Sequence, residues 1–186
     1  MHSHSIAQIR ADLRARFMPL GEAFSAYYLV EKSWDDSAIK QQVLKQLAVT
    51  LPKDFQQFAD DYDLADFSLG PFCFGYQKEK SYWSYLLAIN TVDAFGGCWW
   101  DTVERPAEWL VIALSDPYAV LINCTTEAIY ALDSELGLSK ALMLAPDFMS
   151  FFQAAGCQYL YQVQAQAIAH YLNVPAQAWQ VYSVVE

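Results

Sequence analysis

The stretch WLVIALSDPYAVLINCTTEAIYALD, residues Trp109–Asp133, contains the clearest strand signal in this sequence. It divides into three runs rich in apolar and β-branched residues: Trp109–Leu114, Tyr118–Cys124 and Ala128–Asp133. The turns between the runs are only three residues long. Turns this short join antiparallel neighbours, because parallel strands need a long crossover. The sequence therefore predicts three consecutive antiparallel strands in one sheet.

Regular spacing of apolar residues predicts helices before these strands. Ile6, Ile9, Leu13 and Phe17, for example, fall on one face of a helix. The expected elements are helices at 6–17, from Asp36 or Ser37 through Leu47, from Pro52 through Tyr62 and at 82–90, with short strands around Gly70-Pro71. Residues 22–32 are compatible with a further helix.

Two more helices are expected after the strands. The first begins at Pro146-Asp147 and is expected to end at Gly156. The second is expected from about Gln158 to Leu172, and Pro175 then begins a short tail. The sequence thus predicts a single α+β domain over residues 1–186, with an antiparallel sheet flanked by helices.

The composition is that of a folded and strongly acidic protein. Of its 186 residues, 55% are hydrophobic and 17% are charged, which excludes intrinsic disorder. The net charge is −10, and no Lys or Arg occurs from Ala141 to the end of the chain. Such a surface repels nucleic acid and anionic membranes, so we expect a basic protein partner. The alternative is an acidic protein whose charge only prevents association.

We expect the protein to be cytoplasmic. Arg10, Arg14 and Arg16 stand where a secretory leader would need an apolar stretch. No apolar run approaches the roughly 20 residues of a membrane span. The four cysteines form no CxxC pair and are expected to be buried free thiols rather than disulfides: Cys73, Cys98, Cys124 and Cys157.

No catalytic or cofactor-binding motif is recognisable. The chain has no phosphate loop, dinucleotide fingerprint or nucleophile elbow, and its seven glycines are scattered. His170 stands alone on an apolar helix, without a local signature for a Cys/His pair. Asp61-x-Asp63 resembles the start of a calcium loop but lacks the glycine and glutamate that complete one. We therefore expect no catalytic residue, no cofactor and no metal.

Two groups of residues are candidates for binding a partner. Asp60, Asp61, Asp63 and Asp66 place four carboxylates within seven residues at the predicted end of a helix. Because burying unpaired carboxylates is costly, we expect them to be exposed, either as a solvated helix end or as a patch facing a basic partner. Trp99-Trp100 is either part of the core or an exposed anchor for a protein partner.

Three segments resemble motifs of the SUKH superfamily, which includes bacterial toxin-immunity proteins and fungal cell-wall-synthesis regulators. LPKDFQQFADDY at Leu51–Tyr62 resembles the opening helix of that family. Residues Trp109–Glu135 resemble its central strands, and LAPDFMSFFQAAG at Leu144–Gly156 resembles its closing helix. The resemblance implies a SUKH-like core over residues 51–156, with a helical N-terminal part at 1–50 and a helical C-terminal extension at 157–186.

The resemblance also implies a non-enzymatic binding fold with no catalytic residues to transfer. We favour an immunity protein that neutralises a cognate toxin by stoichiometric binding. A nuclease toxin would have the basic surface that an acidic protein attracts. The alternatives are a regulatory or scaffold protein of the same fold in cell-envelope or signalling control, and an unrecognised hydrolase. A toxin gene beside the gene for this protein would separate the first two functions.

Overall fold

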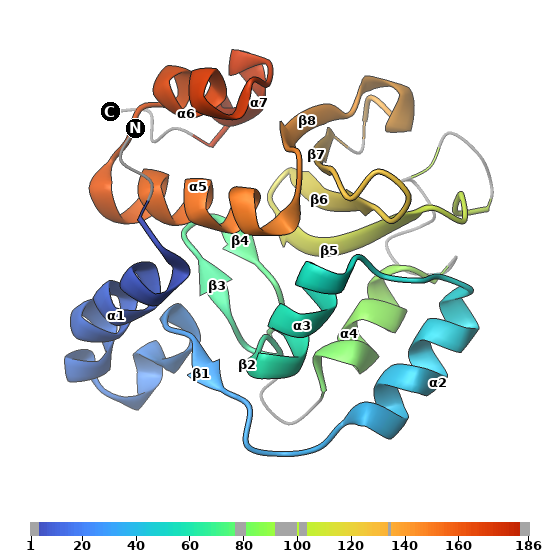
Figure 1. The fold of residues 1–186 in the computed structure, drawn as a ribbon, viewed down its shortest axis with the longest axis horizontal. Helices are drawn as coiled ribbons and strands as arrows, with labels where there is room; N and C mark the ends of the chain where they lie inside the picture. The colour runs from blue at the N-terminus through green and yellow to red at the C-terminus, as the bar shows by residue number, and fades with distance from the viewer. Residues whose placement is uncertain (1–3, 77–80, 92–99, 101–103, 134, 183–186) are drawn as a thin grey trace.

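The computed structural model describes residues 4–76, 81–91, 100, 104–133 and 135–182 (Figure 1). Within these residues, six strands form an antiparallel sheet in the order β3-β4-β5-β6-β7-β8. The strands are β3 (Ser68–Leu69), β4 (Phe72–Cys73), β5 (Trp109–Ser115), β6 (Tyr118–Asn123), β7 (Ile129–Asp133) and β8 (Leu142–Ala145). Separately, β1 (Val30–Glu31) pairs with β2 (Tyr62–Asp63). The predicted α+β class is confirmed.

Helices surround the sheet. The α-helices are α1 (Ile6–Phe17), α2 (Ser37–Leu47), α3 (Lys53–Asp61), α4 (Tyr82–Ile89), α5 (Phe148–Tyr161), α6 (Ala165–Leu172) and α7 (Ala176–Gln180). The 3-10 helices in the described part of the chain are η1 (Met18–Leu20), η2 (Glu22–Tyr27) and η4 (Leu138–Lys140). Figure 1 shows α5 crossing in front of β3 and β4, with α2, α3 and α4 grouped on the β5 side of the sheet. Among the described residues, no helix is long and apolar enough to span a membrane.

The three strands predicted from Trp109–Asp133 are confirmed as antiparallel neighbours. Tyr118 of β6 lies opposite Ser115 of β5 on one side and opposite Asp133 of β7 on the other. Residues Leu110–Ala113 of β5 are buried without a break. Since successive side chains of a strand point to opposite faces, β5 is covered on both faces.

Two polar side chains fasten α4 to β5. Ile112 is an extra residue in β5, because the register with β6 shifts between Val111 and Ala113. Asn90, just after α4, donates to the Val111 carbonyl at 2.8 Å and accepts from the Val111 N–H at 2.9 Å. The Tyr82 hydroxyl donates to the Ile112 carbonyl at 2.9 Å. These bonds satisfy main-chain groups at the irregularity in β5, as buried backbone groups require.

Phenylalanines of α3 and α5 form the centre of the core. The Phe148 ring lies 4.8 Å from Phe55 and 5.1 Å from Phe58, and Phe152 lies 4.7 Å from Phe58, between centroids. All four side chains are buried. Tilted and edge-to-face ring pairs contribute about 0.5–1.5 kcal/mol each beyond their burial. This packing fixes α3, whose last residues carry the acidic stretch.

Gly156 does not end α5, contrary to the prediction. The helix continues to Tyr161, and Gln162 ends it with a left-handed φ of 54°. A Cβ on Gly156 would lie 2.7 Å from the side chain of Ile9 in α1. The glycine therefore allows α1 to pack closely against α5. The single helix predicted over residues 158–172 is instead the end of α5 followed by α6.

Short elements near both ends of the chain were also not predicted. Residues 22–32 form η2 and β1 rather than a longer helix. β8 adds a strand beside β7, and the short tail predicted from Pro175 contains the helix α7. The Trp179 indole N–H of α7 donates to the Leu144 carbonyl at 2.9 Å. This bond ties α7 to β8, the last strand in the sheet order.

Candidate partner-binding surface

The acidic stretch lies where α3 ends and the β1–β2 ladder begins. Asp60 and Asp61 are the last residues of α3, and β2 follows directly. Glu31 of β1 lies opposite Tyr62 of β2, and the Lys32 N–H donates to the Asp61 carbonyl at 2.9 Å. The ladder thereby brings Glu31 of β1 close to Asp60 and Asp61 at the end of α3.

Two adjoining depressions lie at this place. One has a volume of about 380 Å³ and is lined by Glu31, Lys32, Asp60, Asp61 and Tyr62. The other, of about 310 Å³, lies between α1, α3 and α5 and is lined by Ile6, Ala7, Asp54, Gln57, Phe58, Asp61, Tyr62 and Met149. Asp61 and Tyr62 line both depressions. We call Glu31, Asp54, Asp60 and Asp61 the acidic surface.

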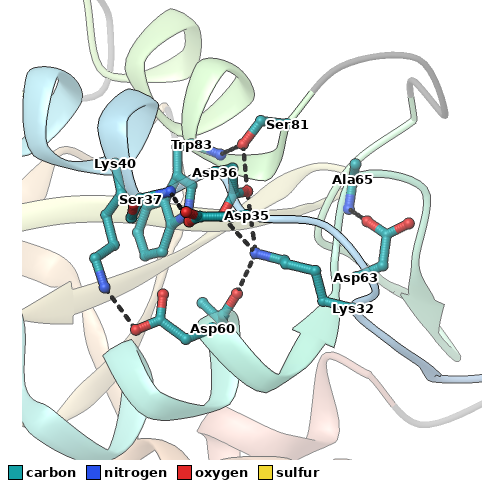
Figure 2. Close-up of polar contacts among 11 residues, drawn as sticks. Lys32, Asp35, Asp36, Ser37, Lys40, Asp60, Asp63, Ala65, Ser81 and Trp83 are labelled. Atoms are coloured by element: carbon teal, nitrogen blue, oxygen red, sulfur yellow. Dashed lines mark hydrogen bonds and ion pairs between the residues drawn. The ribbon is translucent and has the colours of Figure 1, made fainter.

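A buried lysine holds the end of α3 beside the first depression. The Lys32 side chain is only 4% exposed, and its Nζ donates to the Ala59 carbonyl at 2.7 Å (Figure 2). The same Nζ donates to both carboxylate oxygens of Asp36, at 3.1 and 3.2 Å. Asp36 also accepts from the Ser81 hydroxyl at 2.7 Å. Because the C-terminal end of a helix is the negative end of its dipole, the ammonium of Lys32 stabilises this end of α3.

A second lysine pairs with Asp60. Nζ of Lys40, in α2, lies 2.5 Å from Oδ2 of Asp60, and the lysine side chain is 14% exposed. Nζ of Lys32 and Nζ of Lys40 lie 5.8 and 5.6 Å from the ring centroid of the buried Trp83, within cation–π range. The main-chain N–H of Trp83 donates to Oγ of Ser81, which caps α4. Figure 2 shows how this cluster joins α2, α3 and α4 around one indole ring.

The expectation that all four aspartates are exposed is wrong for three of them, because Asp60, Asp63 and Asp66 are half-buried. Asp60 has the lysine partner just described. Asp63 is half-buried and accepts from the Ala65 N–H at 3.0 Å. Burial raises the pKa of Asp63, and that hydrogen bond partly opposes the rise. Asp61 is exposed and accepts from a glutamine of α3 at 2.8 Å, while Asp66 is half-buried. Their role in binding stays a prediction.

The other candidate residues lie elsewhere or outside the description. Trp99 is not among the described residues. Trp100 is half-buried and packs against the hydrophobic core, which favours the core interpretation for this residue. His170 is exposed in the last turn of α6. The described cysteines are free, with Cys157 buried and two others half-buried: Cys73 and Cys124.

Capping of α2 differs from the prediction. Asp36 stands at the N-cap position, but its carboxylate makes no capping hydrogen bond and is bonded to Lys32 and Ser81 instead. The Ser37 N–H donates to the neighbouring Asp35 carboxylate at 2.9 Å. The aspartate that sequence reasoning assigned to a helix end is therefore part of the buried cluster.

Sequence reasoning also missed the lysines and the tryptophan of this cluster. One signal was present, because Lys32 and Asp36 are four residues apart, a spacing typical of helical ion pairs. The segment between them is not helical, however. The pairing of Lys40 with Asp60 spans 20 residues, and no local pattern indicates it.

The acidic surface contains both paired and unpaired carboxylates. Glu31 pairs with Arg10 at 2.6 Å, and Asp60 pairs with its lysine. Asp54 and Asp61 form no ion pair within the part of the chain that the structure describes. In the same part, no three His, Cys, Asp or Glu side chains are grouped so as to hold a metal ion. Two exposed carboxylates are thus available to basic side chains.

No protein-family profile and no curated protein matches this chain.

Proposed function

We propose that the chain is a cytoplasmic, non-enzymatic protein-binding domain, and specifically an immunity protein that neutralises a basic toxin by stoichiometric binding. The observation that carries the proposal is the acidic surface, whose four carboxylates line two adjoining depressions that share Asp61 and Tyr62. The SUKH-like motifs support the same function, because immunity members of that superfamily capture toxins.

Three physical features favour capture of a basic protein. Lys32 and Lys40 are engaged with the end of α3 and with Trp83, so their charges are satisfied internally. The surface is also held by the β1–β2 ladder and the aromatic core, and a rigid surface loses little conformational entropy on binding. The net charge of −10 adds long-range attraction for a basic partner.

The test compares two double variants with the same change in charge. Asp54→Asn with Asp61→Asn removes the two exposed, unpaired carboxylates of the acidic surface. Glu127→Gln with Glu135→Gln removes two exposed carboxylates next to β7. Since both variants lose two negative charges, a difference between them reports the location of the charges and not their number.

Each protein is coexpressed with the product of the gene adjacent to its own, and cell survival and complex stoichiometry are measured. We expect the wild type and the Glu127/Glu135 variant to protect the cell and form a 1:1 complex. The Asp54/Asp61 variant is expected to bind about tenfold more weakly, which corresponds to about 1.4 kcal/mol. Absence of both complex and protection contradicts the immunity function. Equal affinities of the two variants contradict the location of the site.

A further inference from the structure

Four large apolar side chains are exposed together just after α1. Met18 and Leu20 of η1 and Phe24 and Tyr27 of η2 are each between 37% and 55% exposed. The Phe24 and Tyr27 rings lie 6.1 Å apart between centroids, and η1 packs against η2. In Figure 1 this segment lies at the outer edge of the molecule, below α1. We call these four residues the apolar patch, and contiguous patches of this kind mark interaction surfaces.

The apolar patch is a folded surface attached to the core. The Tyr27 ring lies 5.3 Å from the ring of Phe17, which is buried. Gly21 turns the chain between η1 and η2 with a φ of 93°, a conformation that glycine adopts readily and other residues rarely do. The backbone that carries the exposed side chains is therefore folded against the core, and burying the patch in an interface orders little additional main chain.

Charges of both signs adjoin the apolar patch. Arg14 and Arg16 are exposed in the last turn of α1, and Glu22 is exposed at the start of η2. Within the described part of the chain, none of the three forms an ion pair. A basic partner would be repelled by the two arginines. A second copy of this chain presents both signs and the same apolar centre, so it complements the patch in charge and in polarity.

We propose that the apolar patch is the interface of a homodimer with two-fold symmetry. An axis through the patch near Met18 and Leu20, between Arg16 and Glu22, places Arg16 of each copy opposite Glu22 of the partner subunit. The ion pair then forms twice, as a two-fold interface requires. The four apolar side chains of each copy are buried between these pairs. The patch shares no residue with the acidic surface. The homodimer proposal therefore does not rest on the proposed toxin binding.

The first test measures the molar mass in solution over about a hundredfold range of protein concentration. Leu20→Asp places a charge in the centre of the patch, and Leu136→Asp is the matched control because Leu136 is 60% exposed outside the patch. We expect a dimer for the wild type and the control. For Leu20→Asp we expect a dimer dissociation constant raised at least about tenfold. A wild type that stays monomeric, or equal dissociation in both variants, overturns the proposal.

The second test reverses the charges. Arg16→Glu and Glu22→Arg each place like charges opposite one another and are expected to weaken the dimer. The double variant restores both ion pairs with opposite sign and is expected to dimerise more tightly than either single variant. Circular dichroism of each variant confirms that the monomer is folded. A double variant that dimerises no better than the singles overturns the two-fold arrangement.

Discussion

Lys32 explains how an acidic stretch is tolerated at the end of α3. Carboxylates near a helix C-terminus oppose the helix dipole, at a cost of a few tenths of a kcal/mol to about 1 kcal/mol each. Here a buried ammonium donates to the Ala59 carbonyl in the last turn and is itself neutralised by Asp36. The ammonium of Lys32 therefore offsets the negative end of the helix dipole at the place where Asp60 and Asp61 lie.

Asp36→Ala is expected to destabilise the protein by about 3–5 kcal/mol, because it leaves the ammonium of Lys32 buried without its counter-ion. The matched control is Glu31→Gln, which breaks the more exposed pair with Arg10 and should cost less than about 1 kcal/mol. Denaturant unfolding at neutral pH measures both values. A small and equal loss in the two variants would mean that water replaces Asp36 around Lys32.

Asp63 gives a prediction about pH. Its pKa is raised by burial in the folded chain, so the folded state binds a proton at higher pH than the unfolded state. Ionised Asp63 therefore lowers stability above its folded pKa, and this penalty disappears as the pH falls through that pKa. Asp63→Asn keeps an oxygen acceptor for the Ala65 N–H. The variant should melt at a higher temperature than the wild type at neutral pH, with the difference shrinking toward pH of about 3. A lower melting temperature at neutral pH contradicts this prediction.

The carboxylates of the site could be predicted from the sequence, but their partners could not. Asp60 and Asp61 follow an amphipathic helix pattern, so their position at a helix end was indicated locally. The pairing of Asp60 with Lys40 depends on how α2 packs beside α3 and α4, which is a property of the tertiary structure. The resulting burial of Trp83 under two ammonium groups has no signature in the sequence.

At the scale of elements, predictability followed regular patterns and turn signals, since even the two-residue strands β3 and β4 were expected from the turn at Gly70-Pro71. β5, β6 and β7 are five to seven residues long and apolar, so the sequence located them closely. β1 and β2 have two residues each and β8 has four, so they are defined by their pairing partners rather than by a pattern. Glycine often ends a helix, but Gly156 lies inside α5 because α1 packs too closely there for a larger residue.

Gly156→Ala is expected to destabilise the protein by about 1–2 kcal/mol. The added methyl group would meet buried Ile9 at 2.7 Å, and overpacking of this kind costs about 1–3 kcal/mol. The higher helix propensity of alanine returns up to about 1 kcal/mol. The measurement is a double-mutant cycle with Ile9→Ala, in which the double variant should lose less stability than the sum of the singles. Additive losses would show that the two helices do not clash at this point.

Asn90→Ala, which removes a link between α4 and β5, is expected to lower the stability of the fold more than Gly156→Ala does. Asn90→Ala removes the side chain that donates to the Leu86 and Val111 carbonyls and accepts from the Val111 N–H. It leaves buried main-chain groups of β5 without partners, each at about 1–3 kcal/mol, so we expect destabilisation of about 2–4 kcal/mol. Thr91→Ala, one residue further along and exposed, removes a single hydrogen bond to Ala88 and should cost less than about 1 kcal/mol. Equal losses in chemical denaturation contradict the role of Asn90.

At the scale of the whole molecule, most of the excess negative charge and the acidic surface lie in different parts of the chain. Residues 101–186 carry nine acidic and two basic residues, whereas residues 1–100 carry twelve and nine. The acidic surface nevertheless lies entirely in the first part of the chain, at Glu31, Asp54, Asp60 and Asp61. For the proposed basic partner, the overall field would act from a distance, and the local carboxylates would act once that partner is within a Debye length of about 10 Å at 0.1 M salt.

If the proposed function holds, these two contributions separate in the kinetics of association with the proposed toxin. The wild-type association rate should fall as salt is raised from about 0.05 to 0.5 M, because screening weakens the attraction between exposed charges. Removing two charges anywhere lowers the overall field by the same amount, so both double variants should associate more slowly at low salt. Only the Asp54→Asn, Asp61→Asn variant also loses contacts in the complex, so it alone should dissociate faster and show the shallower dependence on salt. Stopped-flow mixing of the three proteins with the toxin measures the rates. Identical salt dependence and dissociation in the two double variants would mean that net charge attracts the partner and that its contacts lie away from the acidic surface.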